Sequence, residues 1–201
     1  ALDHLVTYLE AHPEAGIVGP KVLNRDGSLQ MACRRGIPRP WAMVSYFLRL
    51  YRLFPHNKLF GGYLLNYLDE DETHVVDGVS GSCMLIRRVV AEQLGYFDEH
   101  FFAYQEDADF CFRAQRAGWK VYYHPIAQII HYGGQGGSRA QPYRAIFEWH
   151  RSYYHYYRKN LAKDYNFIFN WFYYGVMGLK LILSLLHNLV RKDKHPGPQR
   201  G

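Results

Sequence analysis

The stretch that decides the fold spans residues 101 to 113 and reads Phe101-Phe102-Ala103-Tyr104-Gln105-Glu106-Asp107-Ala108-Asp109-Phe110-Cys111-Phe112-Arg113. Its three carboxylates fall within four residues, and aromatic residues flank them on both sides. In a helix that starts near Glu106, Asp109 lies three positions further on and Arg113 four positions beyond Asp109. These spacings place the three side chains on one helix face. The pattern therefore predicts that Arg113 holds Asp109 in place.

Asp107 lies between two like charges, which disfavour its ionised form and are expected to raise its affinity for a proton. A carboxylate in this setting is a candidate general base. Acidic residues are also common in the first turn of a helix, where the helix dipole favours negative charge. Spacing alone leaves both interpretations open.

Further motifs surround the acidic stretch in a fixed order. They are Val76-Asp77-Gly78-Val79-Ser80-Gly81-Ser82-Cys83, Gly95-Tyr96-Phe97-Asp98-Glu99, Gly118-Trp119-Lys120-Val121, Pro125, and His131-Tyr132-Gly133-Gly134. Together with the acidic stretch they resemble the C-terminal half of a family 2 glycosyltransferase catalytic domain, which has the GT-A fold. The nearest subgroup is the bacterial rhamnosyltransferase-like enzymes that build cell-wall and surface polysaccharides. The resemblance covers residues 1 to 160 of the chain.

This resemblance implies an α/β, Rossmann-like fold and an inverting transfer of a sugar from a nucleotide-sugar donor. Asp107 is then the catalytic base that removes a proton from the acceptor hydroxyl, and Glu106 beside it positions the acceptor or tunes Asp107. Gly81 and Ser82 fall where the donor sugar and the acceptor meet, although a glycine in a strand can also serve packing alone. The residues assigned to substrate binding are Gly81, Ser82, Asp109 and Arg113, and the last two are expected to hold the helix start in register.

His131 ends an apolar strand and opens a glycine-rich loop. A neutral imidazole at such a place can ligate a metal, although a lone histidine is more often structural. The resemblance implies that His131 completes the shell of a divalent metal, Mg²⁺ or Mn²⁺, which an Asp-x-Asp motif begins. That motif and the nucleotide-binding half are absent from the chain, so we expect it to be the C-terminal portion of a longer enzyme.

Hydrophobic periodicity and turn residues predict the secondary structure. Helices are expected over residues 2–12, 41–54, 88–94, 106–117, 148–160 and 167–190. Strands are expected over residues 16–19, 75–88, 119–123 and 126–130, with a hairpin around Arg25-Asp26-Gly27. The acidic run from Asp69 to Glu72 is expected to be a solvated loop rather than a metal site.

We expect two parts in the chain: residues 1–142 as the C-terminal half of the GT-A domain, and residues 143–201 as an aromatic-rich helical tail that associates with a membrane. Segment 167–190 is long enough to span, but Lys180 near its centre would cost about 2.5–3.5 kcal/mol. Its polar residues form one stripe from Asn170 to Arg191, which favours amphipathic helices lying in the interface or packed on a neighbour. In the interface the stripe would be the wet face. The expected location is the cytoplasmic face of the cell membrane, peripheral or, if the helix spans, integral.

The formal charge of +6 suits anionic partners, and no nucleic-acid-binding motif is present. The expected partners are a nucleotide-sugar donor, with rhamnose as the first candidate sugar, a glycan or lipid-linked acceptor, and a membrane surface. The three cysteines lack metal spacing, and the apolar surroundings of Cys83 and Cys111 indicate core thiols. Two other classes remain open: a metal-dependent hydrolase or nuclease that uses Glu106, Asp107, Asp109 and His131 as ligands, and a catalytically silent membrane-associated fragment.

Overall fold

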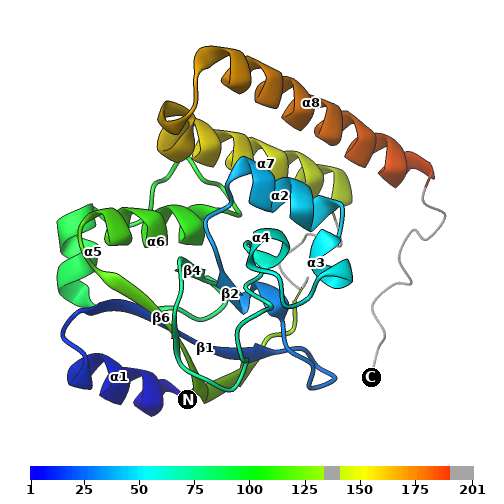
Figure 1. The fold of residues 1–201 in the computed structure, drawn as a ribbon. Helices are drawn as coiled ribbons and strands as arrows, with labels where there is room; N and C mark the ends of the chain where they lie inside the picture. Colours follow the sequence, from blue (N-terminus) through cyan, green and yellow to red (C-terminus); the bar gives the residue numbers. More distant parts are fainter. Residues whose placement is uncertain (134–140, 191–201) are drawn as a thin grey trace. The chain divides into compact units, whose positions relative to one another are not determined.

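The structure is a computed structural model, and it describes residues 1–133 and 141–190 (Figure 1). The chain divides into two compact units. The first consists of Ala1–His100 and Gln105–Tyr132, and the second of Phe101–Tyr104 and the chain from Gly133 onward. The glycine-rich loop expected after His131 lies, beyond Gly133, outside the described residues. Arg191 at the end of the polar stripe lies outside them as well.

A mixed four-stranded sheet forms the centre of the first unit. Its two long strands, β1 (Ala15–Leu23) and β6 (Lys120–Ile130), run parallel, and β5 (Leu85–Ile86) and β3 (His74–Val75) flank them as antiparallel edges. The strand order is β3-β6-β1-β5. The expected α/β class is therefore confirmed.

Alternating residues of the two long strands send side chains to opposite faces of the sheet, as the period of two requires. Ile17 and Val121 pack with Phe110 of helix α6 (Glu106–Arg116). Val18 packs on the other face against Leu5 of helix α1 (Leu2–Ala11). Figure 1 shows α1 on one side of the sheet and α6 with α5 (Arg88–Leu94) on the other. The sheet thus has a helix-covered core on each face, and one of these helices carries the acidic stretch.

The expected break in the last strand is absent, because β6 continues through His124 and Pro125 as one strand. The irregularity appears instead in its register with β1. Pro20 pairs with His124 and the next residue, Lys21, pairs with Gln128. Proline has no N–H to donate to a neighbouring strand, so the ladder skips residues here without ending. The prediction of two separate strands was wrong for this reason.

Other predicted elements are shorter than the sequence pattern indicates. The helix expected over 41–54 is two helices, α2 (Pro40–Phe47) and α3 (Leu50–Leu53), because Arg49 between them has a left-handed backbone with φ of 57°. The following segment holds a further short helix, α4 (Lys58–Gly61). The second arm of the expected hairpin is only a bridge from Leu23 to Leu29 followed by a 3₁₀ turn, η1 (Met31–Cys33).

The segment expected as one interrupted strand over 75–88 contributes to two sheets. Its middle part, β4 (Gly78–Val79), pairs antiparallel with β2 (Arg34–Arg35) in a separate two-stranded sheet. The register places Arg35 opposite Gly78. This pairing brings β2, and with it Arg35, next to the start of α6.

The second unit is a helical hairpin. Helix α7 (Pro142–Tyr156) runs into a π-helical turn, η2 (Tyr157–Leu161), and a 3₁₀ turn, η3 (Ala162–Asp164), before α8 (Phe167–Val190) returns along it. The two helices are antiparallel, because Tyr153 bonds Tyr173 through their hydroxyls at 2.8 Å while Lys180 reaches His150 at 3.0 Å. The expected start of α8 at Phe167 is confirmed, and the helix continues to the last described residue, Val190.

The polar stripe of α8 packs on a neighbouring helix, α7, which is the second of the two arrangements expected from its sequence. Lys180 and the other polar residues of the described stripe, His187 excepted, are half-buried, whereas large apolar side chains are exposed, such as Trp171 at 75%, Phe172 at 68% and Val190 at 80%. The prediction of a wet polar face was therefore wrong. Lys180 gains a hydrogen-bond partner on α7, and Asn170 gains partners in the turns between the two helices, which leaves the apolar side outward.

Candidate active site

A strained backbone precedes the helix that carries the acidic pair. Tyr104 and Gln105 are consecutive left-handed residues with φ of 67° and 65°. Non-glycine residues in this region cost on the order of 1–3 kcal/mol each and cluster at functional sites. The N–H of Asp109 donates to the Gln105 carbonyl at 2.8 Å, so the helix begins directly after the strained pair. Glu106 and Asp107 consequently occupy its first turn.

Asp107 is held by three donors. Its Oδ2 accepts from Nη2 of Arg35 at 2.5 Å and from the N–H of Gly81 at 2.8 Å, and its Oδ1 accepts from the N–H of Ala108 at 2.7 Å. The residue is only 8% exposed. The helix dipole alone favours acidic residues at a helix start without burying them, so these contacts support the catalytic interpretation over the helix-start one.

Arg35 is the site residue that sequence reasoning missed. Its Nη2 also donates to the Val79 carbonyl at 3.2 Å, and its side chain hydrogen-bonds with that of Tyr63. Burial is the largest single influence and disfavours the charge of Arg35, but Asp107, Tyr63 and Cys111 together outweigh it, so the pKa of the guanidinium is raised above its usual value. Among the described residues its Nε has no hydrogen-bond partner. No local sequence signal links Arg35 to Asp107, because the contact depends on the pairing of β2 with β4.

The pKa of the Glu106 carboxyl group is raised above its usual value. Burial is the larger cause and the charge of Asp107 the second. Its Oε2 is buried and has no hydrogen-bond partner in the described part of the chain. The expected rise in proton affinity concerned Asp107, and for that residue it stays a prediction.

Gly81 brings a main chain close to both carboxylates. A Cβ added there would lie 3.4 Å from Cβ of Asp107 and 3.7 Å from Oε1 of Glu106. The next residue, Ser82, donates its hydroxyl to Oγ of Ser80 at 3.0 Å within the same turn. The structure thus brings Gly81, Glu106 and Asp107 together, and Ser82 follows directly in the chain.

Asp109 and Arg113 form the expected ion pair, with Nε of Arg113 2.8 Å from Oδ2 of Asp109. The guanidinium also donates to the carbonyls of Leu94 at 2.8 Å and Tyr96 at 2.7 Å. Asp109 is fully buried. These contacts tie α6 to the end of α5, and the assignment of the two residues to substrate binding stays a prediction.

His131 lies just after β6 and is held by Gln30. Its Nδ1 is 3.0 Å from Oε1 of Gln30, and its carbonyl accepts from Nε2 of Gln30 at 2.8 Å. An N–H at Nδ1 that donates to an oxygen leaves Nε2 as the metal-binding nitrogen, which is the usual arrangement of a ligating histidine. The exposed ring therefore fits one position in a metal shell. Within residues 1–133 and 141–190 no contact joins His131 to Glu106 or Asp107.

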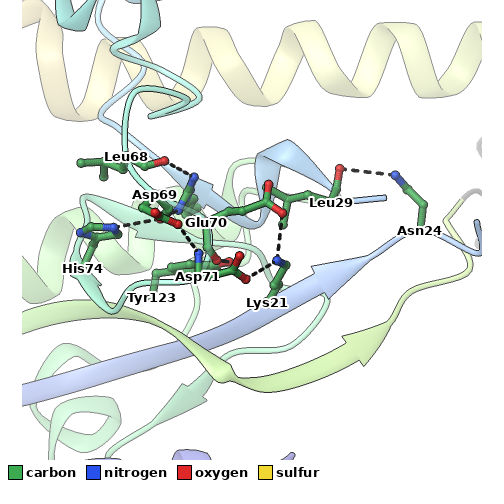
Figure 2. A network of polar contacts seen from close by, with 10 residues as sticks. Lys21, Asn24, Leu29, Leu68, Asp69, Glu70, Asp71, His74 and Tyr123 are labelled. Atoms are coloured by element: carbon green, nitrogen blue, oxygen red, sulfur yellow. Dashed lines mark hydrogen bonds and ion pairs between the residues drawn. The ribbon is translucent and has the colours of Figure 1, made fainter. Parts of the chain in front are cut away.

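In the second acidic cluster, Asp69 to Glu72, two carboxylates pair with a lysine (Figure 2). Nζ of Lys21, a residue only 8% exposed, lies 2.9 Å from Oε1 of Glu70 and 2.7 Å from Oδ1 of Asp71. The hydroxyl of Tyr123 donates to the Glu70 carbonyl at 2.7 Å. The acidic run remains largely exposed, as expected of a solvated loop, but these two carboxylates also neutralise a buried ammonium. This weakens the case for a second metal-binding cluster and hence for a two-metal hydrolase.

The chemistry available at the α6 start is proton transfer. A carboxylate has about four lone-pair positions, and three donors leave room at Asp107 for the proton of a hydroxyl group. The guanidinium of Arg35 holds this carboxylate in place. Gly81 leaves space beside it, because no side chain occupies that position.

Comparison with known proteins identifies the family of the chain. The family model described as "Glycosyl transferase family group 2" matches residues 11–191. An N-acetylglucosaminyl-diphospho-decaprenol L-rhamnosyltransferase of Mycobacterium tuberculosis is 32% identical over 154 residues, which are 77% of this chain and 49% of that protein. A low-salt glycan biosynthesis hexosyltransferase of Haloferax volcanii is 30% identical over 57% of this chain and 32% of its own length. The rhamnosyltransferase WbbL of Escherichia coli is 35% identical over 46% of this chain and 35% of its own length.

The chain thus spans half or less of the length of these curated relatives. The family match, in contrast, extends over most of the chain and includes β1, the β2–β4 sheet, α6, β6 and both helices of the hairpin. The chain belongs to family group 2 of the glycosyl transferases.

Proposed function

We propose that the protein transfers a sugar, with inversion, from a nucleotide-sugar donor to a glycan or lipid-linked acceptor of the cell wall or surface. The observation that carries this proposal is the buried carboxylate of Asp107, fixed by Arg35 and the N–H of Gly81 at a helix start. Two of the relatives are named as rhamnosyltransferases, and one of these names includes a diphospho-decaprenol. Rhamnose is therefore the first candidate sugar and a lipid diphosphate the first candidate acceptor.

In the proposed reaction Asp107 accepts the proton of the acceptor hydroxyl. The acceptor oxygen then forms a bond to the anomeric carbon, while the bond from that carbon to the diphosphate oxygen breaks on the opposite face. The proton ends on the Asp107 carboxyl group and the electron pair on the departing diphosphate. Glu106, whose pKa burial raises, supplies a protonated or ionised oxygen with which to orient the acceptor.

A divalent metal, Mg²⁺ or Mn²⁺, is part of this proposal. When bound, it offsets negative charge on the leaving diphosphate. His131 would supply one ligand through Nε2, oriented by the contact of its Nδ1 with Gln30.

The second unit is proposed to hold the enzyme at the cytoplasmic face of the membrane. In the described part of the chain, α8 is the one helix whose length and composition would allow it to cross a bilayer. Its apolar face is exposed over its whole length, from Phe167 at 73% to Val190 at 80%. Exposed apolar surface of this extent is typical of membrane or protein contact. Trp171 at 75% exposure adds an aromatic side chain that favours the interface.

The test is to incubate the natural protein with dTDP-rhamnose, a divalent metal and a lipid-linked acceptor, and to determine the anomeric configuration of the product by NMR. The proposal predicts a new glycosidic bond with the configuration opposite to that of the donor. Retained configuration, or phosphodiester hydrolysis without sugar transfer, contradicts it.

A further inference from the structure

The hairpin of α7 and α8 contains an open groove of about 380 Å³. Its lining residues come from one position of α7 and from the C-terminal half of α8: Ile146, Lys180, Leu183, Ser184, His187 and Asn188. Four of these six side chains carry an ammonium, a hydroxyl, an imidazole or an amide. A groove on a highly apolar helix thus gathers hydrogen-bond donors at one place.

Contacts with α7 fix the ammonium of Lys180, a residue that lines this groove. The Nδ1–H of His150 donates to the Ile146 carbonyl at 2.7 Å, which leaves Nε2 as the acceptor for Nζ of Lys180 at 3.0 Å. Nζ also lies 4.8 Å from the centre of the Trp149 ring, a distance typical of a cation–π contact. Burial lowers the pKa of Lys180 to about 8. An anion bound beside the ammonium would stabilise its charged form.

Exposed apolar surface adjoins these donors on the same half of α8. Leu183, which lines the groove, is 56% exposed, and Leu186 and Leu189 are 51% and 64% exposed. Ser184 and Asn188 are one helical turn apart and alternate with these leucines. The surface is therefore complementary to a ligand with an oxygen-rich anionic head and an apolar tail.

We propose that this groove binds the phosphate headgroup of an anionic phospholipid. Lys180 provides the positive charge, and the side chains of Ser184, His187 and Asn188 donate hydrogen bonds to several phosphate oxygens. Leu183 then lies beside the start of an acyl chain. The proposal rests on the placement of the hairpin at a membrane, and it adds a specific lipid site to the general attraction of an apolar helix for lipid.

The test is vesicle flotation of the full chain with phosphatidylcholine alone and with phosphatidylcholine containing phosphatidylglycerol. We expect at least tenfold tighter binding to the anionic vesicles and a tenfold or greater loss of that preference in Lys180→Met. Lys163→Met is the matched control, because it removes an equal charge from an exposed position of the same unit outside the groove. That control should lose about fivefold or less, the effect of one charge near an anionic surface.

His187→Leu is a second test variant. Simple partitioning of α8 into lipid and specific phosphate binding predict opposite changes in its affinity for anionic vesicles. His187 is exposed, so its replacement leaves the hairpin folded, which circular dichroism checks for each variant. The substitution makes α8 more apolar, so simple partitioning into lipid would strengthen binding, whereas loss of a phosphate donor weakens binding to the anionic vesicles.

Stronger vesicle binding by His187→Leu would contradict the proposal that the groove binds a phosphate headgroup. Equal losses of vesicle affinity in the Lys180 and Lys163 variants would contradict it as well. Groove-dependent binding of vesicles that contain a polyprenyl diphosphate, without a preference for phosphatidylglycerol, overturns the choice of lipid. Sugar transfer is assayed separately with a detergent-solubilised acceptor, so a failure of the lipid site is distinguishable from a failure of the proposed reaction.

Discussion

Arg35 and Asp107 lie 72 positions apart in the chain and form a buried ion pair of 2.5 Å, with each side chain 11% exposed. The main chain of Gly81 donates to the same carboxylate oxygen. A buried carboxylate is costly unless it is paired and hydrogen-bonded. The β2–β4 sheet therefore does more than support the fold, because it delivers the cation that allows Asp107 to remain buried.

Replacing Arg35 with Met should destabilise the protein by about 3 kcal/mol, since it leaves the charge of Asp107 buried without its partner. Equilibrium urea unfolding monitored by circular dichroism measures the change. In an Asp107→Asn background the same replacement should cost far less. Additive effects of the two substitutions would contradict the pairing, and Arg25→Met in the exposed turn is the control.

Glu106→Gln should stabilise the protein at neutral pH, because it removes a charge that burial and the neighbouring Asp107 disfavour. Because the folded-state pKa of Glu106 is raised, the folded state binds more protons than the unfolded state above the usual glutamate pKa. Stability of the natural protein therefore falls as pH rises through that range, and the variant lacks this term. Unfolding measured at several pH values should show the two proteins converge at acid pH. A difference that is constant with pH would show that Glu106 titrates normally.

Local elements were predictable from the sequence because their signals are local. Helix α6 starts at Glu106, α5 ends before Gly95 with φ of 74°, and α8 starts at Phe167, as apolar periodicity and glycine placement indicate. The Asp109–Arg113 ion pair follows from a spacing of four on one helix. Each of these depends on residues within a few turns of each other.

The missed features depend on pairing between distant segments. Arg35 reaches Asp107 because β2 pairs with β4, and β6 continues past Pro125 because its pairing with β1 resumes at Gln128. The direction of the α8 stripe was also beyond the sequence pattern. Periodicity locates a polar face but does not say whether water or another helix covers it, and His150 on α7 decides this for Lys180.

His131→Ala should raise the metal concentration needed for half-maximal activity, because one ligand of the proposed shell is lost. Gln30→Ala should give a smaller shift of about tenfold, the usual effect of removing the group that orients a ligating histidine. Activity of the natural protein titrated with Mg²⁺ and Mn²⁺ measures both, with His4→Ala on the exposed face of α1 as the control. Unchanged titrations in the first two variants would assign His131 to structure alone.

Trp171→Asp should weaken binding to anionic vesicles by tenfold or more, because it places a charge in the exposed apolar face of α8. Trp171 is 75% exposed, so the change should alter the free energy of unfolding by no more than about 0.5 kcal/mol. Flotation measures the binding, and Leu2→Asp, at 62% exposure on α1, is the matched control. Equal binding by the natural protein and the Trp171 variant would exclude this face from membrane contact. Carbonate washing then separates a helix that lies in the interface from one that spans.

The most direct test of the central claim is the single-turnover rate of sugar transfer by Asp107→Asn in the natural protein, measured beside its affinity for the nucleotide-sugar donor. Loss of a general base predicts a fall in rate of about 10²–10⁴-fold, with donor affinity unchanged and Asp3→Asn on α1 as active as the natural protein. A rate within tenfold of the natural protein, in a variant shown to be folded, would contradict the assignment of Asp107 as the base.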